Sequence, residues 1–156
     1  MEIEKKYLIK ELPEDLQSYP HHVLEQSYLC VDPVVRVRKI DESYVLTTKS
    51  RDIPEAAESN LCVANEWECS LSEEAYLKLR EKADGIVIKK TRYKIPYGDY
   101  TIELDVFYGE YEGMKLAEVE FPSIEAAREF VAPDWFGEDV SDDFRYRNNY
   151  LATKHK

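Results

Sequence analysis

The sequence has few cysteines, and their spacing suggests neither a bridge nor a metal site. Cys30, Cys62 and Cys69 are an odd number of residues, and no two of them form a CxxC pair. Disulfide frameworks and zinc sites use cysteines in larger, regularly spaced sets. We therefore expect reduced thiols, as in a cytoplasmic protein.

Long apolar runs are also absent. No uncharged segment approaches the roughly 18 apolar residues of a membrane span, and the opening MEIEKKYLIK lacks the apolar core of a signal peptide. The sequence contains no glycine-rich phosphate loop and no Ser-His-Asp or Cys-His arrangement. These absences exclude P-loop chemistry and serine or cysteine nucleophiles, and they predict a cytoplasmic protein without a membrane partner.

Positive charge is in short supply. Lys and Arg total 21 against 32 Asp and Glu, which gives a formal net charge of −11. Such a chain repels nucleic acid unless its basic groups are concentrated locally, whereas it attracts divalent cations. We therefore expect a small-molecule ligand, no nucleic-acid partner, and a monomer or homodimer.

Length and composition favour one folded unit. A chain of 156 residues, 44% of them hydrophobic, has the size and apolar content of a single domain, so we expect residues 1–156 to form one. Alternation of charged and apolar residues between turn signals predicts strands. The predicted strands are 2–9, 23–31, 34–40, 44–50, 62–71, 86–96, 99–108 and 115–121.

Serine caps and proline breaks predict a few helices among these strands. Ser72 and Ser123 are placed to cap helices, and Pro133 ends the second one. The expected helices are 72–83, 124–131 and 141–152, and residues 51–61 are expected to form a surface loop. Eight strands with two or three helices predict an α+β fold, built on an antiparallel sheet or barrel.

Ionisable residues recur two apart along these strands, and they segregate by sign. Residues two apart share one face of a strand, and the residues between them, such as Trp67 and Leu104, are mostly apolar. We expect the helices and the rest of the sheet to cover that apolar face. A solvated sheet face is the simplest explanation for one such strand, but a solvated face usually mixes the two signs. The acidic sets are Glu2 with Glu4, Glu66 with Glu68, Glu103 with Asp105, and Glu118 with Glu120; the basic sets are Arg36 with Arg38, and Lys90 with Arg92 and Lys94, while Lys6 shares the face of Glu2 and Glu4 and Lys49 stands on a further strand.

Like charges on adjacent strands repel each other, so the segregation calls for a ligand that both signs bind. Carboxylates bind Mg²⁺ or Mn²⁺, and Arg and Lys bind phosphate oxygens. A barrel with its charged faces inward fits a short polyanion together with a divalent metal. The sequence therefore predicts binding of a phosphate chain inside a closed barrel.

The same residues resemble a known family. The opening Glu2-Ile3-Glu4-Lys5-Lys6 resembles the ExExK signature of the CYTH superfamily, the triphosphate tunnel metalloenzymes. The ordered charged pairs continue the resemblance over nearly the whole chain, as does the tail from Asp142 to Asn148. It implies an eight-stranded antiparallel closed β-barrel with a few peripheral helices. It also implies hydrolysis of a triphosphate with Mg²⁺ or Mn²⁺, as in short bacterial members that act on inorganic tripolyphosphate.

The resemblance implies a role for each charged position. Glu4, Lys6, Glu66 and Glu68 would be catalytic. The metal would be held by Glu2, Glu4, Glu103, Asp105, Glu118 and Glu120. The phosphate chain would be bound by Lys6, Arg36, Arg38, Lys49, Lys90, Arg92 and Arg145, the last reaching in from a terminal helix.

This chain departs from the family pattern at one position, and its charged faces suit more than one function. The family often carries a basic residue shortly before the fifth-strand ExE motif, where this chain has Ser59-Asn60-Leu61-Cys62. The same tunnel would also serve an adenylyl cyclase that makes cyclic AMP from ATP. A protein that binds polyphosphate without turnover, or a purely structural β-domain with its charged faces in solvent, would show similar patterning.

Overall fold

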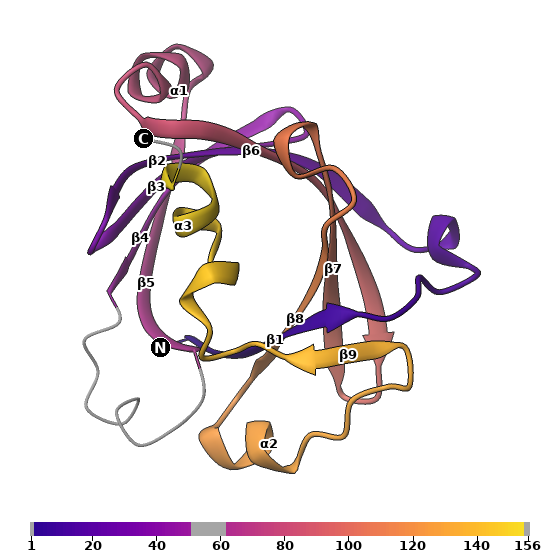
Figure 1. Cartoon of the computed structure of the whole chain (residues 1–156). Helices are drawn as coiled ribbons and strands as arrows, with labels where there is room; N and C mark the ends of the chain where they lie inside the picture. The colour runs from indigo at the N-terminus through magenta and orange to yellow at the C-terminus, as the bar shows by residue number, and fades with distance from the viewer. Residues whose placement is uncertain (1, 51–61, 155–156) are drawn as a thin grey trace.

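The computed structural model describes residues 2–50 and 62–154. Short loops connect the helices and strands in a chain dominated by β-structure (Figure 1). Within these described ranges, three short 3-10 helices cover Leu16–Ser18, Gly109–Tyr111 and Phe144–Tyr146. The strands are β1 Glu2–Ile9, β2 His21–Val31, β3 Val34–Ile40, β4 Ser43–Ser50, β5 Cys62–Leu71, β6 Asp84–Tyr97, β7 Tyr100–Tyr108, β8 Lys115–Phe121 and β9 Phe136–Asp139; the helices are α1 Glu73–Arg80, α2 Ile124–Glu129 and α3 Asn148–Thr153.

Eight of the strands close into an antiparallel barrel. Around the ring the order is β5-β4-β3-β2-β6-β7-β8-β1, and the pairing of β5 with β1 closes it. The short strand β9 pairs with the end of β1 that β5 leaves open, where Ile9 lies opposite Phe136. The closed eight-stranded barrel predicted from the sequence is therefore confirmed, with β9 as an addition.

The predicted helices form, but all three are shorter than expected, and α1 already ends at Arg80. The Ser72 and Ser123 side chains accept hydrogen bonds from the amides of Ala75 and Ala126 at 3.1 and 3.0 Å, so both N-caps are as predicted. Helix α2 ends at Glu129. The predicted helix 141–152 divides into a 3-10 turn and α3. The predicted loop 51–61 lies outside the described residues.

The main hydrophobic core lies on the outside of the ring. Ile3, Leu104 and Val119 project outward from β1, β7 and β8, and they are at most 4% exposed. They belong to a cluster with Phe136 of β9 and Ala127 of α2, so α2 and the chain around it cover this outer face (Figure 1). The apolar side of these strands is thus buried against peripheral segments, which leaves their charged side to face the barrel interior.

Helix α3 closes one end of the barrel from within (Figure 1). Leu151 and Ala152 are buried against inward-facing Tyr28, Ile88 and Leu116, which form a second apolar cluster. The Tyr111 hydroxyl donates a hydrogen bond to the carbonyl of Leu151 at 2.6 Å. The chain therefore has an apolar seal at one end of a barrel whose centre is charged.

One outward position departs from the prediction. The sequence placed Trp67 on an apolar face that helices would cover, yet its side chain is 57% exposed. Helix α1 packs mainly on β2, β3 and β4, and α2 packs mainly on β1 and β8. The outer face of β5 around Trp67 thus has no helix over it among the described elements. No helix in the described part of the chain is long and apolar enough to cross a membrane.

The close packing of α3 against Gly85 predicts that even a small substitution at this residue lowers the stability of the protein strongly. This residue has a φ of 74°, and a Cβ there would overlap the backbone carbonyl of Ala152 in α3. We expect Gly85→Ala to lower the free energy of unfolding by about 3 kcal/mol or more, because a positive φ and a backbone clash add up. Gly98→Ala is the matched control, since Gly98 has a φ of 59° and open space around it. Urea unfolding should show a loss of about 1 kcal/mol in the free energy of unfolding for Gly98→Ala. Equal losses in the two variants would contradict the close approach of Gly85 to the Ala152 carbonyl.

Candidate active site

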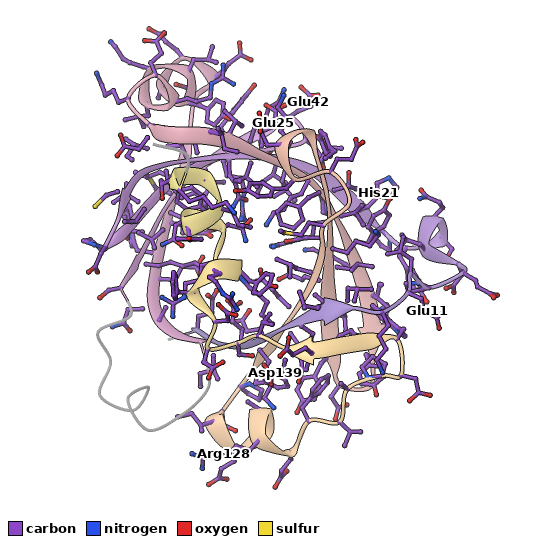
Figure 2. The ribbon with its side chains drawn as sticks, viewed as in Figure 1. Glu11, His21, Glu25, Glu42, Arg128 and Asp139 are labelled. Carbon is purple, nitrogen blue, oxygen red and sulfur yellow. The ribbon has the colours of Figure 1, made fainter. Side chains whose placement is uncertain are left out.

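A cavity of about 550 Å³ occupies the centre of the barrel. Strand side chains crowd the interior of the ring in Figure 2, whereas Glu25, Glu42 and Arg128 lie on its outside. The lining is almost entirely ionisable, with seven acidic and seven basic side chains. The acidic ones are Glu2, Glu4, Glu66, Glu68, Glu103, Glu118 and Glu120; the basic ones are Lys6, Arg36, Arg38, Lys49, Lys90, Arg92 and Arg147.

The two signs occupy opposite halves of the ring. Strands β5, β1, β8 and β7 are consecutive around the barrel, and they carry all seven glutamates. Strands β6, β2, β3 and β4 are also consecutive, and they carry Lys90, Arg92, Arg36, Arg38 and Lys49. Lys6 is the one strand cation of the described lining within the acidic half. The strand-by-strand segregation in the sequence thus becomes an acidic half and a basic half that face each other across the cavity.

The acidic half brings like charges directly opposite one another. Glu4 on β1 lies opposite Glu120 on β8, and Glu118 lies opposite Glu103 on β7. Burial and the nearby Glu118 carboxylate raise the pKa of Glu4 to about 8. Burial also raises the pKa of Glu120, with Glu2 and Glu103 adding to the effect. This half of the cavity therefore has a deficit of positive charge.

Glu118 is the exception within the acidic half, because cations surround it. Burial opposes its ionisation, but Lys6 and Arg92 hold the pKa of Glu118 well below its usual range. Their nitrogens lie 3.7 and 3.8 Å from its Oε1. Lys6 also donates a hydrogen bond to the carbonyl of Tyr146 at 3.1 Å. Glu118 and Lys6 thus lie where the charged cavity meets the C-terminal segment.

Lys49 occupies the other border of the acidic half. Its Nζ lies 2.9 Å from Glu2 Oε1 and 4.0 Å from Glu66 Oε2. Glu68 is linked to the basic half in a different way. Thr47 donates to Glu68 at 3.4 Å and accepts from Arg36 at 3.2 Å. Glu66 and Glu68 therefore line the cavity beside phosphate-binding candidates.

Asp105 is placed differently from its predicted role as a metal ligand. It is fully buried and does not line the cavity. Its oxygens lie 2.7 Å from Lys90 Nζ and 2.8 and 2.9 Å from two Arg92 nitrogens. Burial opposes ionisation of Asp105, yet Arg92 and Lys90 lower its pKa. Asp105 is thus the counter-charge that holds two buried cations in the basic half.

The terminal segment presents Arg147 to the cavity, not Arg145. The Arg145 side chain is 66% exposed and forms a two-pronged pair with Asp143, at 2.9 and 2.6 Å. The prediction that Arg145 reaches into the tunnel is wrong because its 3-10 turn points it outward. Arg147 follows two residues later and lines the cavity, where its buried Nε has no hydrogen-bond partner among the described atoms.

The cavity lining also contains four uncharged polar residues for which the sequence predicted no role, namely Gln26, Tyr28, Asn148 and Asn149. Gln26, Tyr28 and Asn148 are buried and line the cavity beside the basic half. Asn148 accepts hydrogen bonds from Lys90 and Gln26 at 2.9 and 3.2 Å. Gln26 and Tyr28 stand two apart on β2, so the same spacing that revealed the charged faces also marks them.

The acidic half has the chemistry of a divalent metal site. Carboxylate oxygens are the hard ligands that Mg²⁺ and Mn²⁺ prefer, and burial together with neighbouring carboxylates raises the pKa values of Glu2, Glu4 and Glu120, so a nearby cation would stabilise their ionised forms. Among the described residues, no three His, Cys, Asp or Glu side chains are already gathered into ligating geometry. The residues fit a cation held jointly by carboxylates, a bound anion and water.

Comparison with known proteins gives consistent matches over almost the whole chain. The sequence model of the CYTH domain family matches residues 1–154. An inorganic triphosphatase of Nitrosomonas europaea is 38% identical over 157 residues, covering 97% of this chain and 96% of the relative. One of Acetivibrio thermocellus is 36% identical over 154 residues, covering 97% and 92%. The crystal structure of the inorganic triphosphatase NE1496 superposes with a TM-score of 0.69 at 34% identity, covering 97% and 94%.

The pKa of Glu4 predicts how stability depends on pH in metal-free protein. The folded state keeps the Glu4 proton up to about pH 8, whereas the usual value of this carboxyl is 4.5. The folded state therefore binds more protons in between, and the free energy of unfolding falls as pH rises from 4.5 to 8. We expect Glu4→Gln to be more stable than wild type at pH 9 and to lose less stability between pH 5 and 9. Urea unfolding in EDTA tests this, with exposed Glu11→Gln as control; parallel profiles for wild type and Glu4→Gln would refute it.

Proposed function

The chain belongs to the CYTH domain family, and on that premise we propose that it hydrolyses inorganic triphosphate with Mg²⁺ or Mn²⁺ inside its barrel. The observation that carries the proposal is the acidic half facing the basic half across one cavity. A short, highly charged anion with a divalent cation complements both halves. Two relatives that carry the name inorganic triphosphatase, at 38% and 36% identity over nearly the whole chain, support it.

The basic half binds the phosphate chain in this proposal. Arg36 is 6% exposed, and its Nε is buried without a hydrogen-bond partner among the described atoms. A buried donor of this kind calls for an acceptor, and a phosphate oxygen supplies one. Arg38, Lys90 and Arg92 line the same wall. Burial and the neighbouring Arg36 and Arg92 lower the pKa of Arg38, so a bound anion stabilises its charged form.

The acidic half holds the metal in this proposal. Glu4, Glu118 and Glu120 are the ligand candidates, with Glu2 and Glu103 beside them. Asp105 is not among them, because its oxygens already pair with Lys90 and Arg92. When bound, the cation supplies charge neutralisation at the phosphate oxygens.

The chain's own residues account for the rest of the reaction. A water oxygen attacks the terminal phosphorus, and the bond from that phosphorus to its bridging oxygen breaks, which releases phosphate and pyrophosphate. Phosphoryl transfer depends mainly on positioning and charge neutralisation. The basic half neutralises the equatorial and leaving oxygens. Glu66 and Glu68 border the cavity and orient the water, while Lys6 stabilises charge near the scissile bond.

The lining favours an inorganic substrate over a nucleotide. Among the described lining residues, Tyr28 is the one aromatic side chain, and it is 2% exposed. A base usually binds by stacking on an exposed ring. Product analysis after incubation with tripolyphosphate or ATP distinguishes hydrolysis from the two alternatives, which are cyclic AMP formation from ATP and binding without turnover.

The proposal predicts metal-dependent phosphate release from tripolyphosphate. We expect release with Mg²⁺ or Mn²⁺, none in EDTA, and slower release from ATP without formation of cyclic AMP. Glu4→Gln should lower kcat/KM roughly 100-fold or more, because it removes a carboxylate that supports the cation. Thermal melting of the variant is the control for folding. Undiminished activity in Glu4→Gln, or cyclic AMP as the main product from ATP, would contradict the proposal.

A second prediction separates the two terminal arginines. Arg147 lines the cavity and Arg145 pairs with Asp143 outside it. We expect Arg147→Gln to raise KM for tripolyphosphate roughly 10-fold or more, since a charge-assisted hydrogen bond contributes about 1.5–3 kcal/mol. Arg145→Gln, two residues away, should change KM less than about twofold. Steady-state kinetics decide, and equal effects, or a larger effect at Arg145, would show that Arg147 is not a phosphate ligand.

A further inference from the structure

Gln26 is a neutral amide at the middle of the basic half. It is completely buried on β2, between the strands that carry Arg36 with Arg38 on one side and Lys90 with Arg92 on the other. Directly opposite it on β3 is Arg38. A buried amide that is fully hydrogen-bonded fixes its neighbours, whereas an unpaired one is costly.

The hydrogen bonds of Gln26 determine which way its amide points. Arg38 Nε lies 2.9 Å from Gln26 Oε1. A guanidinium N–H can only donate, so the amide oxygen must face Arg38 and the NH₂ group must face away from it. The NH₂ group then donates to the Tyr28 hydroxyl at 2.7 Å and to Asn148 Oδ1 at 3.2 Å.

Asn148 is oriented by the same rule. Lys90 Nζ donates to Asn148 Oδ1 at 2.9 Å, and an ammonium group has no acceptor. The oxygen of Asn148 must therefore face both Lys90 and the Gln26 NH₂ group. Two amides, each oriented by a cation, thus connect Arg38 on β3 with Lys90 on β6 across the strand between them.

The contact with Gln26 restricts how Arg38 can bind an anion. A guanidinium pairs with an oxyanion either through Nε and one terminal nitrogen or through both terminal nitrogens. Because Nε of Arg38 is engaged by Gln26, only its two terminal nitrogens are available to a phosphate in the cavity. The amide also keeps a neutral group between Arg38 and Lys90, where a third cation would add repulsion.

We propose that Gln26 is a positioning residue that directs the two terminal nitrogens of Arg38 toward the phosphate chain, and that ties this orientation to Asn148 of the C-terminal helix. The inference rests on the proposed function for its substrate, and it assigns no chemical step to Gln26. A packing role alone would affect stability, whereas a positioning role depends on the presence of Arg38.

The test is a double-mutant cycle on tripolyphosphate binding and turnover. Gln26→Met keeps the size of the side chain but removes all three hydrogen bonds. We expect it to raise KM with Mg²⁺ roughly 10-fold, with a smaller change in kcat, and to weaken metal-free binding measured by calorimetry in EDTA by a similar factor. In an Arg38→Met background, adding Gln26→Met should change KM and the dissociation constant less than about twofold, because Arg38, the residue that Gln26 positions, is then absent.

Ser27→Ala is the matched control. Ser27 lies next to Gln26 on β2, is 1% exposed, and has a buried hydroxyl without a hydrogen-bond partner among the described atoms. Its removal perturbs the same strand without touching the cavity, so KM and binding should match wild type.

The outcomes separate the inference from the proposed function. Unchanged KM and binding in Gln26→Met would overturn the positioning role, as would an equal fold-change with and without Arg38. If wild type binds tripolyphosphate but does not hydrolyse it, the proposed function fails, while the calorimetric cycle still measures the role of Gln26. If wild type neither binds nor hydrolyses tripolyphosphate, both proposals are wrong.

Discussion

A charged side chain enclosed in a protein needs an opposite charge close by, and the arrangement of the strands and helices meets this need for the charged residues inside the barrel. A closed barrel that turns glutamates, lysines and arginines inward cannot keep its hydrophobic core there. The core therefore lies outside the ring, under α2 and β9, and α3 seals one end with Leu151 and Ala152. Within the ring, the acidic strands stand together and face the basic ones. The apolar parts of the chain thus stabilise a cavity that would otherwise be costly to form.

The cavity contains equal numbers of acidic and basic side chains, but not every one of them has a partner of opposite charge nearby. Seven acidic and seven basic side chains line it, so the formal net charge of −11 resides entirely on residues elsewhere. Some of these side chains pair with each other, such as Lys6 with Glu118 and Lys49 with Glu2. Others are left over: Glu4 has a pKa of about 8, and Arg36 has a buried donor without a partner among the described atoms. A cation on one side and a polyanion on the other complete both halves.

Period-two patterning carried most of the prediction, and its failures have physical reasons. Alternation located eight strands and the inward face, because a strand places every second residue on one side. Strand β9 was missed because four residues after Pro133 are too short to show a period. Arg145 was placed in the tunnel because the phase of a 3-10 turn is not visible in sequence. Asp105 was predicted to be a metal ligand because its buried partners Lys90 and Arg92 come from another strand. Gln26 was overlooked because it is neutral: its spacing from Tyr28 places it on the inward face, but its role depends on contacts with Arg38 and Asn148 from other parts of the chain.

The most direct test of the account is to locate both ligands in the barrel. Crystals soaked with Mn²⁺ and a triphosphate analogue with imido bridges, which resists hydrolysis, would show the metal by anomalous scattering and the phosphates by density. We expect Mn²⁺ beside Glu4, Glu118 and Glu120, and phosphate groups against Arg36, Arg38 and Arg92. Phosphate bound outside the barrel, or Mn²⁺ away from these glutamates, would contradict the claim that the opposed charged halves form the active site.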